Sequence, residues 1–213
     1  KKHPTKNQPF YRKFKKTRCG LCGFIPVQMC QLEVDHIDGN HKNNMITKDQ
    51  INSYAHKFNT NESTVYREYL QILFLNKFYK NEKSSQVFFK GGTAIHFLLG
   101  ASRFSEDLDF TVTSSESDFL SLINSVFKEF VKEGEFSFKE RKTITGKRFL
   151  LTADRNILPY ATFINLDFSF REKVLQPNKS TFDTVYPVIF TSFIYHLSSE
   201  EMCAEKIRAL LTR

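Results

Sequence analysis

Two aspartates separated by one residue, Asp107 and Asp109, are the side chains in this sequence best suited to metal chemistry. They lie in the run 107–112, DLDFTV, whose alternation predicts a strand with both carboxylates on one face. Neighbouring carboxylates repel each other unless a cation lies between them, and Mg²⁺ prefers one or two carboxylates together with substrate phosphates. The pair therefore predicts a magnesium site, and a polar strand face in water is the ordinary alternative.

A pair of glycines, Gly91 and Gly92, precedes these aspartates and follows the run 86–90, which predicts a short strand. The segment 93–99 has helical spacing, so the pair predicts a sharp turn into a helix. Free backbone N–H groups at a helix start bind phosphate oxygens, and the Thr93 hydroxyl would add another donor. Together with the two aspartates, this turn predicts a site for a metal–triphosphate.

The run 91–110, GGTAIHFLLGASRFSEDLDF, resembles the signature of the AbiEii abortive-infection toxins, a branch of the DNA polymerase β-like nucleotidyltransferases. The resemblance implies a toxin of a toxin–antitoxin or phage-defence pair that has a cognate antitoxin. It implies nucleotide transfer from an NTP, with Mg²⁺, to RNA, tRNA foremost, or to a protein. By this likeness Asp107 and Asp109 bind the metal, and the other active-site or phosphate-binding residues here are Lys90, Gly91, Gly92, Thr93, Arg103 and Ser105.

Two later motifs fit the same resemblance. The strand-like run 161–170, ATFINLDFSF, carries Asp167 on its polar face, where the superfamily has a third acidic residue that ligates the metal or takes the acceptor's proton. The run 201–210 resembles the family's AEKxRAL helix, and by that likeness Lys206 binds nucleotide phosphates. An exposed aspartate and a solvated lysine are the ordinary alternatives. The family continues beyond such a helix into a helical half, which we expect to be missing here.

The front of the chain carries a different set of possible ligands. Residues 18–44 resemble the first half of an HNH endonuclease, in which Cys19 and Cys22 would begin a structural zinc site. A tetrahedral zinc site needs four ligands, so without the family's later CxxCH we expect only a partial Zn²⁺ site. By the same likeness, Asp35 would touch the catalytic metal, His36 would activate water, and Asn40 would lie nearby.

Two other functions stay open on this sequence. The front segment could make the protein an HNH-type endonuclease, or a nucleic-acid-binding module derived from one, with the rear part as a scaffold. Alternatively, the chain is an inactive truncated chimera in which neither half is complete. One equivalent of zinc that is lost on Cys19→Ser, with DNA cleavage lost on His36→Ala, would favour the nuclease.

Composition predicts a folded protein without a membrane span. The 213 residues are 40% hydrophobic and include 23 Phe, which is enough for a core in one mid-sized domain or two small ones. Residues 1–45 hold nine Lys and Arg against three Asp and Glu, and the rest holds 22 against 20, so the basic charge lies at the front. No uncharged apolar run approaches the ~18 residues that cross a bilayer, so we expect a cytoplasmic location.

The expected fold is α/β (α+β), a nucleotidyltransferase-like mixed sheet flanked by helices over residues 45–213, after a basic, partial HNH or zinc-knuckle-like arm over 1–44. The predicted helices cover 51–58, 61–73, 93–99, 114–131 and 198–210, the last with Cys203, Ile207 and Leu210 as its buried stripe. The predicted strands cover 86–90, 107–112, 136–138, 147–152, 161–170 and 185–190, with a loop at 171–183.

Overall fold

The structure is a computed structural model that describes residues 45–132, 136–153 and 157–211. The helices are α1 (Lys48–Lys57), α2 (Glu62–Tyr79), the 3-10 helix η4 (Glu82–Gln86), α3 (Gly91–Leu99), α4 (Glu116–Lys132) and α5 (Ser199–Leu211). The strands are β1 (Val87–Lys90), β2 (Asp107–Val112), β3 (Phe136–Arg141), β4 (Lys147–Ala153), β5 (Thr162–Ser169), β6 (Pro177–Ser180) and β7 (Ile194–Leu197). None of the helices in these ranges is long and apolar enough to cross a membrane.

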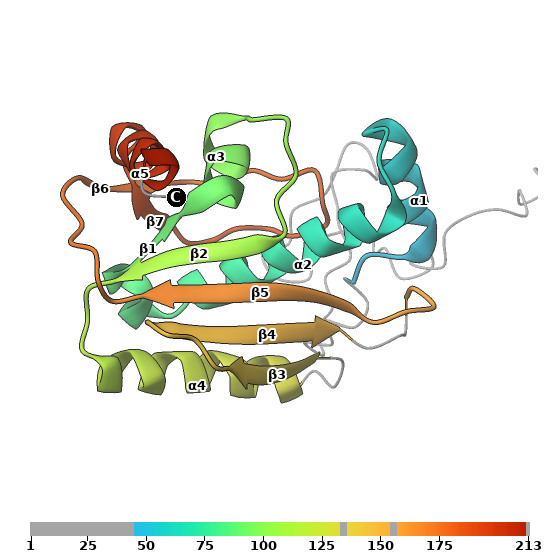
Figure 1. The fold of residues 1–213 in the computed structure, drawn as a ribbon. Helices are drawn as coiled ribbons and strands as arrows, with labels where there is room; N and C mark the ends of the chain where they lie inside the picture. The colour runs from blue at the N-terminus through green and yellow to red at the C-terminus, as the bar shows by residue number, and fades with distance from the viewer. Residues whose placement is uncertain (1–44, 133–135, 154–156, 212–213) are drawn as a thin grey trace, which may run out of the picture. The chain divides into compact units, whose positions relative to one another are not determined.

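The sheet is mixed, and its strand order is β3-β4-β5-β2-β1-β7-β6 (Figure 1). β2 pairs with β5 in parallel and with β1 in antiparallel orientation, while β3, β4 and β5 form an antiparallel meander. β1 also pairs in parallel with β7. The predicted mixed sheet flanked by helices is therefore confirmed, whereas the predicted boundary between residues 44 and 45 stays a prediction.

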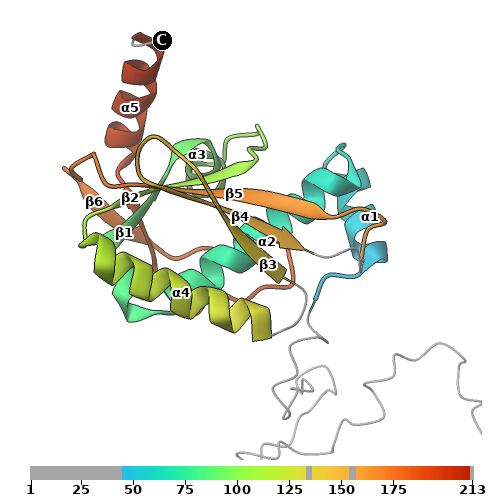
Figure 2. The ribbon, with the colours of Figure 1, turned by 60° about the horizontal axis from the view of Figure 1, so that its bottom comes forward.

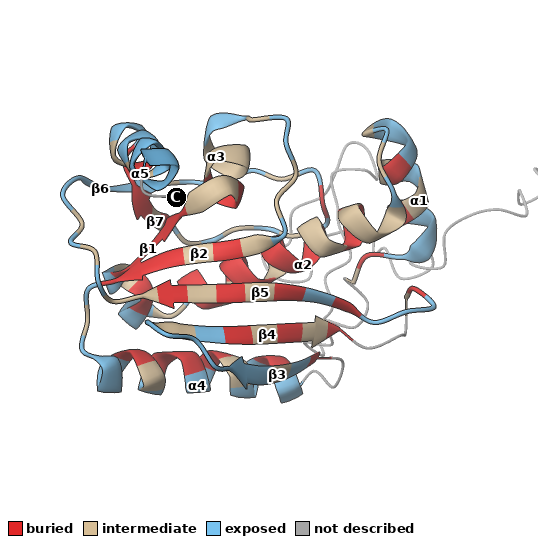
Figure 3. Ribbon diagram, in the orientation of Figure 1, coloured by how far each residue is buried: buried red, intermediate tan, exposed pale blue. Residues whose placement is uncertain are grey.

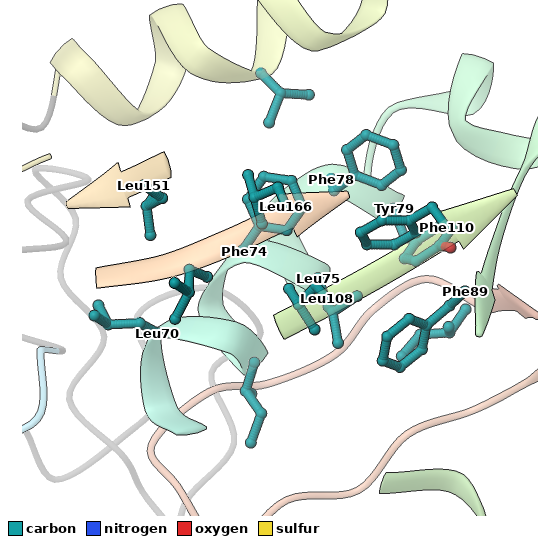
Figure 4. Packing of buried hydrophobic residues seen from close by; sticks show 14 of the residues in the cluster. Leu70, Phe74, Leu75, Phe78, Tyr79, Phe89, Leu108, Phe110, Leu151 and Leu166 are labelled. Carbon is teal, nitrogen blue, oxygen red and sulfur yellow. The ribbon is translucent and has the colours of Figure 1, made fainter. Parts of the chain in front are cut away.

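One face of the sheet packs against α2 and α4. The rings of Phe74 and Phe78 on α2 lie 6.3 and 5.7 Å from Phe110 on β2, and Phe110 stacks on Phe168 of β5 at 4.8 Å. From α4, Phe119 lies 4.7 Å from Phe168. Figure 4 shows the α2 and β2 rings meeting in this core. Because these strand residues point toward the helices, their immediate neighbours along each strand point to the opposite face.

Helix starts follow the local sequence. Thr47 and Gln50 form a capping box: the Thr47 hydroxyl accepts from Gln50 N at 3.2 Å, and Gln50 Oε1 accepts from Thr47 N at 2.9 Å. Asn61 caps α2 by accepting from Thr64 N at 2.8 Å. These caps satisfy backbone N–H groups that have no partner inside the helix.

The prediction for the chain after β5 is wrong in two places. Residues 185–190 form no strand; Pro187 has no N–H to donate to a ladder, and Ile189 is 82% exposed. The strands in this region are instead β6, inside the predicted loop, and β7, which is only four residues long. β7 is mostly buried because it lies between β1 and β6.

The predicted buried stripe of α5 is also wrong. Only Met202 is buried on this helix, whereas Cys203 is exposed and Ile207 and Leu210 are 53% and 72% exposed. Figure 2 shows α5 projecting away from the sheet, and Figure 3 shows its exposed surface. The helix contacts the rest of the domain through its first half, as far as Lys206, so helical periodicity did not reveal which residues would be covered.

Candidate active site

Three carboxylates gather on the face of the sheet opposite α2 and α4. In the parallel pairing of β2 with β5, Asp109 lies opposite Asp167 and Asp107 lies opposite Asn165. The intervening Leu108 and Phe110 are fully buried on the other side, so the alternation predicted for β2 holds. Residues far apart in the chain thus place their acidic side chains in adjacent positions of two neighbouring strands.

The environment of Asp109 opposes its negative charge. Burial and, to a smaller extent, the charges of Asp167 and Asp107 raise the pKa of Asp109 to about 6, against smaller lowering effects of Lys90 and Lys206. A carboxylate whose ionised form is disfavoured by neighbouring carboxylates is stabilised by a cation placed among them. The electrostatics of the cluster are therefore those of a site that lacks positive charge.

Two polar residues that sequence reasoning missed hold these carboxylates. Asn165 Nδ2 donates to Asp107 Oδ1 at 2.9 Å, and Arg148 Nε donates to Asp167 Oδ1. Asn165 was recognisable as a polar-face neighbour of Asp167 in the same strand. Arg148 was not, because its position opposite Asp167 depends on the register of β4 with β5, which no local pattern encodes.

The glycine turn lies against the acidic cluster. Gly91 has φ +83°, and a Cβ atom there would lie 2.1 Å from Asp109 Oδ2. A Cβ atom on Gly92 would lie 3.1 Å from Ser105 Oγ and 3.9 Å from Lys206 Nζ. The first turn of α3, Asp109, Ser105 and Lys206 therefore converge, as the sequence motifs suggested.

One predicted phosphate ligand, Thr93, makes a structural contact. Thr93 is fully buried, and its hydroxyl donates to the Asp107 carbonyl oxygen, which fastens the start of α3 to β2. Gln71 on α2 holds the loop before β2 by donating from Nε2 to the Ser105 carbonyl oxygen at 2.9 Å. Arg103 is exposed on that same loop. A phosphate-binding role for Thr93 or Arg103 stays a prediction.

Lys90 ties the turn to α5. Its ammonium lies 3.2 Å from Glu205 Oε1 and 3.5 Å from Glu172 Oε2, and its side chain is only 11% exposed. Because Lys206 directly follows Glu205 in α5, this ion pair fixes the part of the helix that brings Lys206 to the glycine turn. In this structure Lys90 contacts protein carboxylates, and its contact with phosphate stays a prediction.

The donor set suits a hard cation that substrate completes. Within the described residues, no group of three or more His, Cys, Asp or Glu side chains already forms a cage able to hold a metal ion. Carboxylate oxygens of Asp107, Asp109 and Asp167, with the raised pKa of Asp109, nevertheless fit Mg²⁺, which takes one or two carboxylates plus substrate phosphates. The candidate zinc and nuclease residues lie outside the described residues: Cys19, Cys22, Asp35, His36 and Asn40.

A mixed sheet with helices on one face, and carboxylates beside a glycine turn on the other, defines a nucleotidyltransferase-like protein. The family model of the nucleotidyl transferase AbiEii toxin, type IV toxin–antitoxin system, matches residues 73–213. The chain belongs to this family. The match begins within α2 and includes the glycine turn, all three aspartates and Lys206.

Two solved structures are similar to the chain at 20% sequence identity. One is a protein from H. pylori assigned as a nucleotidyltransferase, with a TM-score of 0.46 over 68% of this chain and 58% of that one. The other is JHP933 from Helicobacter pylori, with a TM-score of 0.44 over 65% of this chain and 55% of that one. The chain thus spans little more than half the length of either protein. No curated protein matches the chain.

Gly91→Ala is expected to destabilise the protein by about 2 kcal/mol or more, since it adds a clash with Asp109 to the ~1–2 kcal/mol that a side chain costs at positive φ. Gly100→Ala is the matched control, because Gly100 has φ +72° but nothing within 4 Å of its Cβ position. Urea unfolding of both variants measures the difference. Equal losses would show that the contact with Asp109 does not restrict residue 91.

Proposed function

We propose that the protein is a toxin that transfers a nucleoside monophosphate from an NTP to a hydroxyl group of RNA, with tRNA as the first candidate. Membership of the AbiEii family supports the reaction class. The observation that carries the proposal is the position of Asp109, opposite Asp167 and directly against Gly91. This arrangement puts acidic side chains where a turn that suits phosphate begins a helix.

Each group has a chemical role in this proposal. The acceptor oxygen attacks the α-phosphorus, the bond from that phosphorus to the bridging oxygen breaks, and pyrophosphate leaves. Asp167 takes the proton of the attacking hydroxyl, while Arg148 orients its carboxylate. Backbone N–H groups at Gly92 and the Lys206 ammonium hold phosphate oxygens.

A magnesium ion would be held by Asp107 and Asp109. When bound, the ion supplies positive charge that offsets the charge developing on the phosphates. Asn165 restrains Asp107 through its hydrogen bond, and the buried Thr93 hydroxyl keeps the same residue's backbone against α3. Rigid support of both kinds keeps the ligands in position before substrate arrives.

The biological setting belongs to the same proposal. A toxin of this family acts beside a cognate antitoxin, and its NTP and RNA substrates place it in the cytoplasm. Coexpression provides a direct readout, because a toxin that modifies RNA arrests growth when it is produced without its antitoxin.

Incubation of the protein with each labelled NTP, Mg²⁺ and total tRNA tests the reaction. We expect label in RNA with at least one NTP, and a decrease of about 10³-fold or more for Asp107→Ala, because oriented electrostatic groups contribute effects of this size. Asp49→Ala, an exposed aspartate in the first turn of α1, is the control that should keep full activity. No transfer with any NTP, or transfer unchanged in Asp107→Ala, would refute the proposal.

A further inference from the structure

Basic side chains lead directly from an edge of the sheet to the acidic cluster. The strand pairings place Arg141 on β3 opposite Arg148 on β4, Arg148 opposite Asp167 on β5, and Asp167 opposite Asp109. Residues paired in this way share one face of a sheet, and neighbouring strands lie ~4.8 Å apart. The backbone of Arg141 is thus two strands, or roughly 10 Å, from that of Asp167.

The next row on the same face adds another cation. Lys139 lies opposite Leu150, which lies opposite Asn165, the residue that holds Asp107. Phe138, which directly precedes Lys139 on β3, stacks on Phe127 of α4 at 3.7 Å, so Lys139 points away from the helices. Lys139 and Arg141 are both exposed. Two rows therefore carry positive charge toward the three carboxylates.

Arg148 is where the basic rows meet the acidic cluster. Its Nε donates to Asp167, its side chain is 48% exposed, and a guanidinium has four further N–H donors beyond Nε. These donors can bind a phosphate oxygen while Nε keeps its carboxylate. Arg148 is thus able to join a bound phosphate to the group that would take the acceptor's proton.

An exposed aromatic ring completes this face. Phe163 is 47% exposed and lies two residues before Asn165, so it points to the same side as the carboxylates. The Arg67 guanidinium lies 6.0 Å from its ring centroid and is itself held by Glu106 at 2.7 Å. An aromatic ring beside basic side chains is the combination that binds single-stranded nucleic acid, since bases stack on the ring while cations hold the backbone.

We propose that this face of β3, β4 and β5 binds the acceptor as a single-stranded nucleic acid. Its phosphates lie on Lys139, Arg141 and Arg148, a base stacks on Phe163, and its terminal hydroxyl reaches Asp167. This inference rests on the proposed function, which determines that the end of the nucleic acid with the terminal hydroxyl lies at Asp167. It adds the site and the single-stranded form of the acceptor, because the charges and the ring occupy an exposed strand surface.

The test uses two double variants. The β3 variant is Lys139→Ala/Arg141→Ala. The α4 control is Lys128→Ala/Lys132→Ala, which removes the same charge from exposed positions on the helix of the opposite face. Fluorescence anisotropy with a 15-nucleotide single-stranded RNA, and with DNA of the same sequence, measures binding at several salt concentrations. We expect about tenfold weaker binding for the β3 variant only. Its plot of log affinity against log salt should be shallower by about 1.4, since each contact with a single strand contributes ~0.7.

Enzyme kinetics separate this inference from the proposed function. The β3 variant should raise the KM for the acceptor about tenfold, while stabilisation of the protein by NTP and Mg²⁺ stays at the wild-type level. Lysines on an edge strand also prevent strand pairing between molecules, and that role would change aggregation but not the acceptor KM. Phe163→Ala should weaken oligonucleotide binding by a similar factor.

Three outcomes would overturn this inference. They are equal weakening in the α4 control, an unchanged acceptor KM in the β3 variant, and labelling of protein instead of nucleic acid by the wild type. Absence of transfer by the wild type to any acceptor would instead refute the proposed function. Oligonucleotide binding would then still decide whether this face holds nucleic acid.

Discussion

Asp109→Asn is expected to abolish nucleotide transfer and, at the same time, to make the metal-free protein more stable. Transfer should decrease by about 10³-fold or more, because an amide cannot replace the negative charge that holds the metal. Stability should rise because the fold forces this carboxylate to lie near Asp167 and Asp107. Such opposite effects on activity and stability are typical of a site whose carboxylates repel one another until a bound cation supplies positive charge.

The raised pKa of Asp109 determines how the stability of the protein changes with pH. The pKa of Asp109 is raised from 3.8 to about 6, so its ionised form is disfavoured in the folded state, and stability is lost as pH rises from about 4 to 6. The difference of about two pKa units corresponds to at most ~3 kcal/mol, since one unit is 1.36 kcal/mol. The Asn variant should therefore gain about 1–3 kcal/mol over the wild type at pH 7.5, and little at pH 4.

Thermal unfolding in EDTA at pH 4 and pH 7.5 measures both effects. Added Mg²⁺ should then raise the unfolding temperature of the wild type and leave that of Asp109→Asn unchanged. The control is Asp49→Asn on α1, which should respond as the wild type does. A variant that is less stable than the wild type at pH 7.5, or that retains transfer, would contradict the assignment of Asp109 to a metal site.

Lys90→Met should lower the free energy of unfolding by about 3–5 kcal/mol, a larger loss than that expected for Gly91→Ala. The ammonium lies between Glu205 and Glu172, whose side chains are 23% and 16% exposed, and its removal leaves two partly buried carboxylates facing an apolar side chain. For a domain with a typical stability of about 5–15 kcal/mol, such a loss leaves much of the protein unfolded at 37 °C. Urea unfolding gives the magnitude.

A second lysine supplies the control. Lys147 also forms two ion pairs, at 3.1 Å to Glu116 and 3.5 Å to Glu140, but these glutamates are 60% and 59% exposed. Solvent screens such pairs, so Lys147→Met should change stability little. In a double variant with Glu205→Gln, Lys90→Met should recover part of its loss. Similar losses for both lysines, or no recovery, would show that the Lys90 contacts do not anchor α5.

Local patterns predicted the part of the site that lies within single segments. The alternation in β2 and β5 correctly assigned the faces of Asp107, Asp109 and Asp167, because strand periodicity depends only on neighbouring residues. The glycine turn before α3 was predicted for the same reason. Arg148 was missed, since its contact with Asp167 depends on how two strands align.

The errors after β5 have the same physical origin. The apolar residues near Pro187 look like a strand, but an irregular segment there keeps Ile189 in solvent. β7, in contrast, is four residues long and gains its burial from β1 and β6 on its two sides. In Ile207 and Leu210 the spacing of a buried stripe was present, yet tertiary packing left both exposed. Burial that other segments provide cannot be read from one segment.

Because the acidic cluster lies on the parallel strands β2 and β5, it forms only when both parts of the sheet are folded. The hydrogen bond from Asn165 to Asp107 joins residues that are 58 positions apart, while the β3-β4-β5 meander and the antiparallel pair β1-β2 each consist of strands that follow one another in the order of strands along the chain. Each of these halves holds only part of the carboxylates, so local unfolding of either one disassembles the site. A nicked or partly unfolded chain would therefore lose its chemistry before it lost most of its secondary structure.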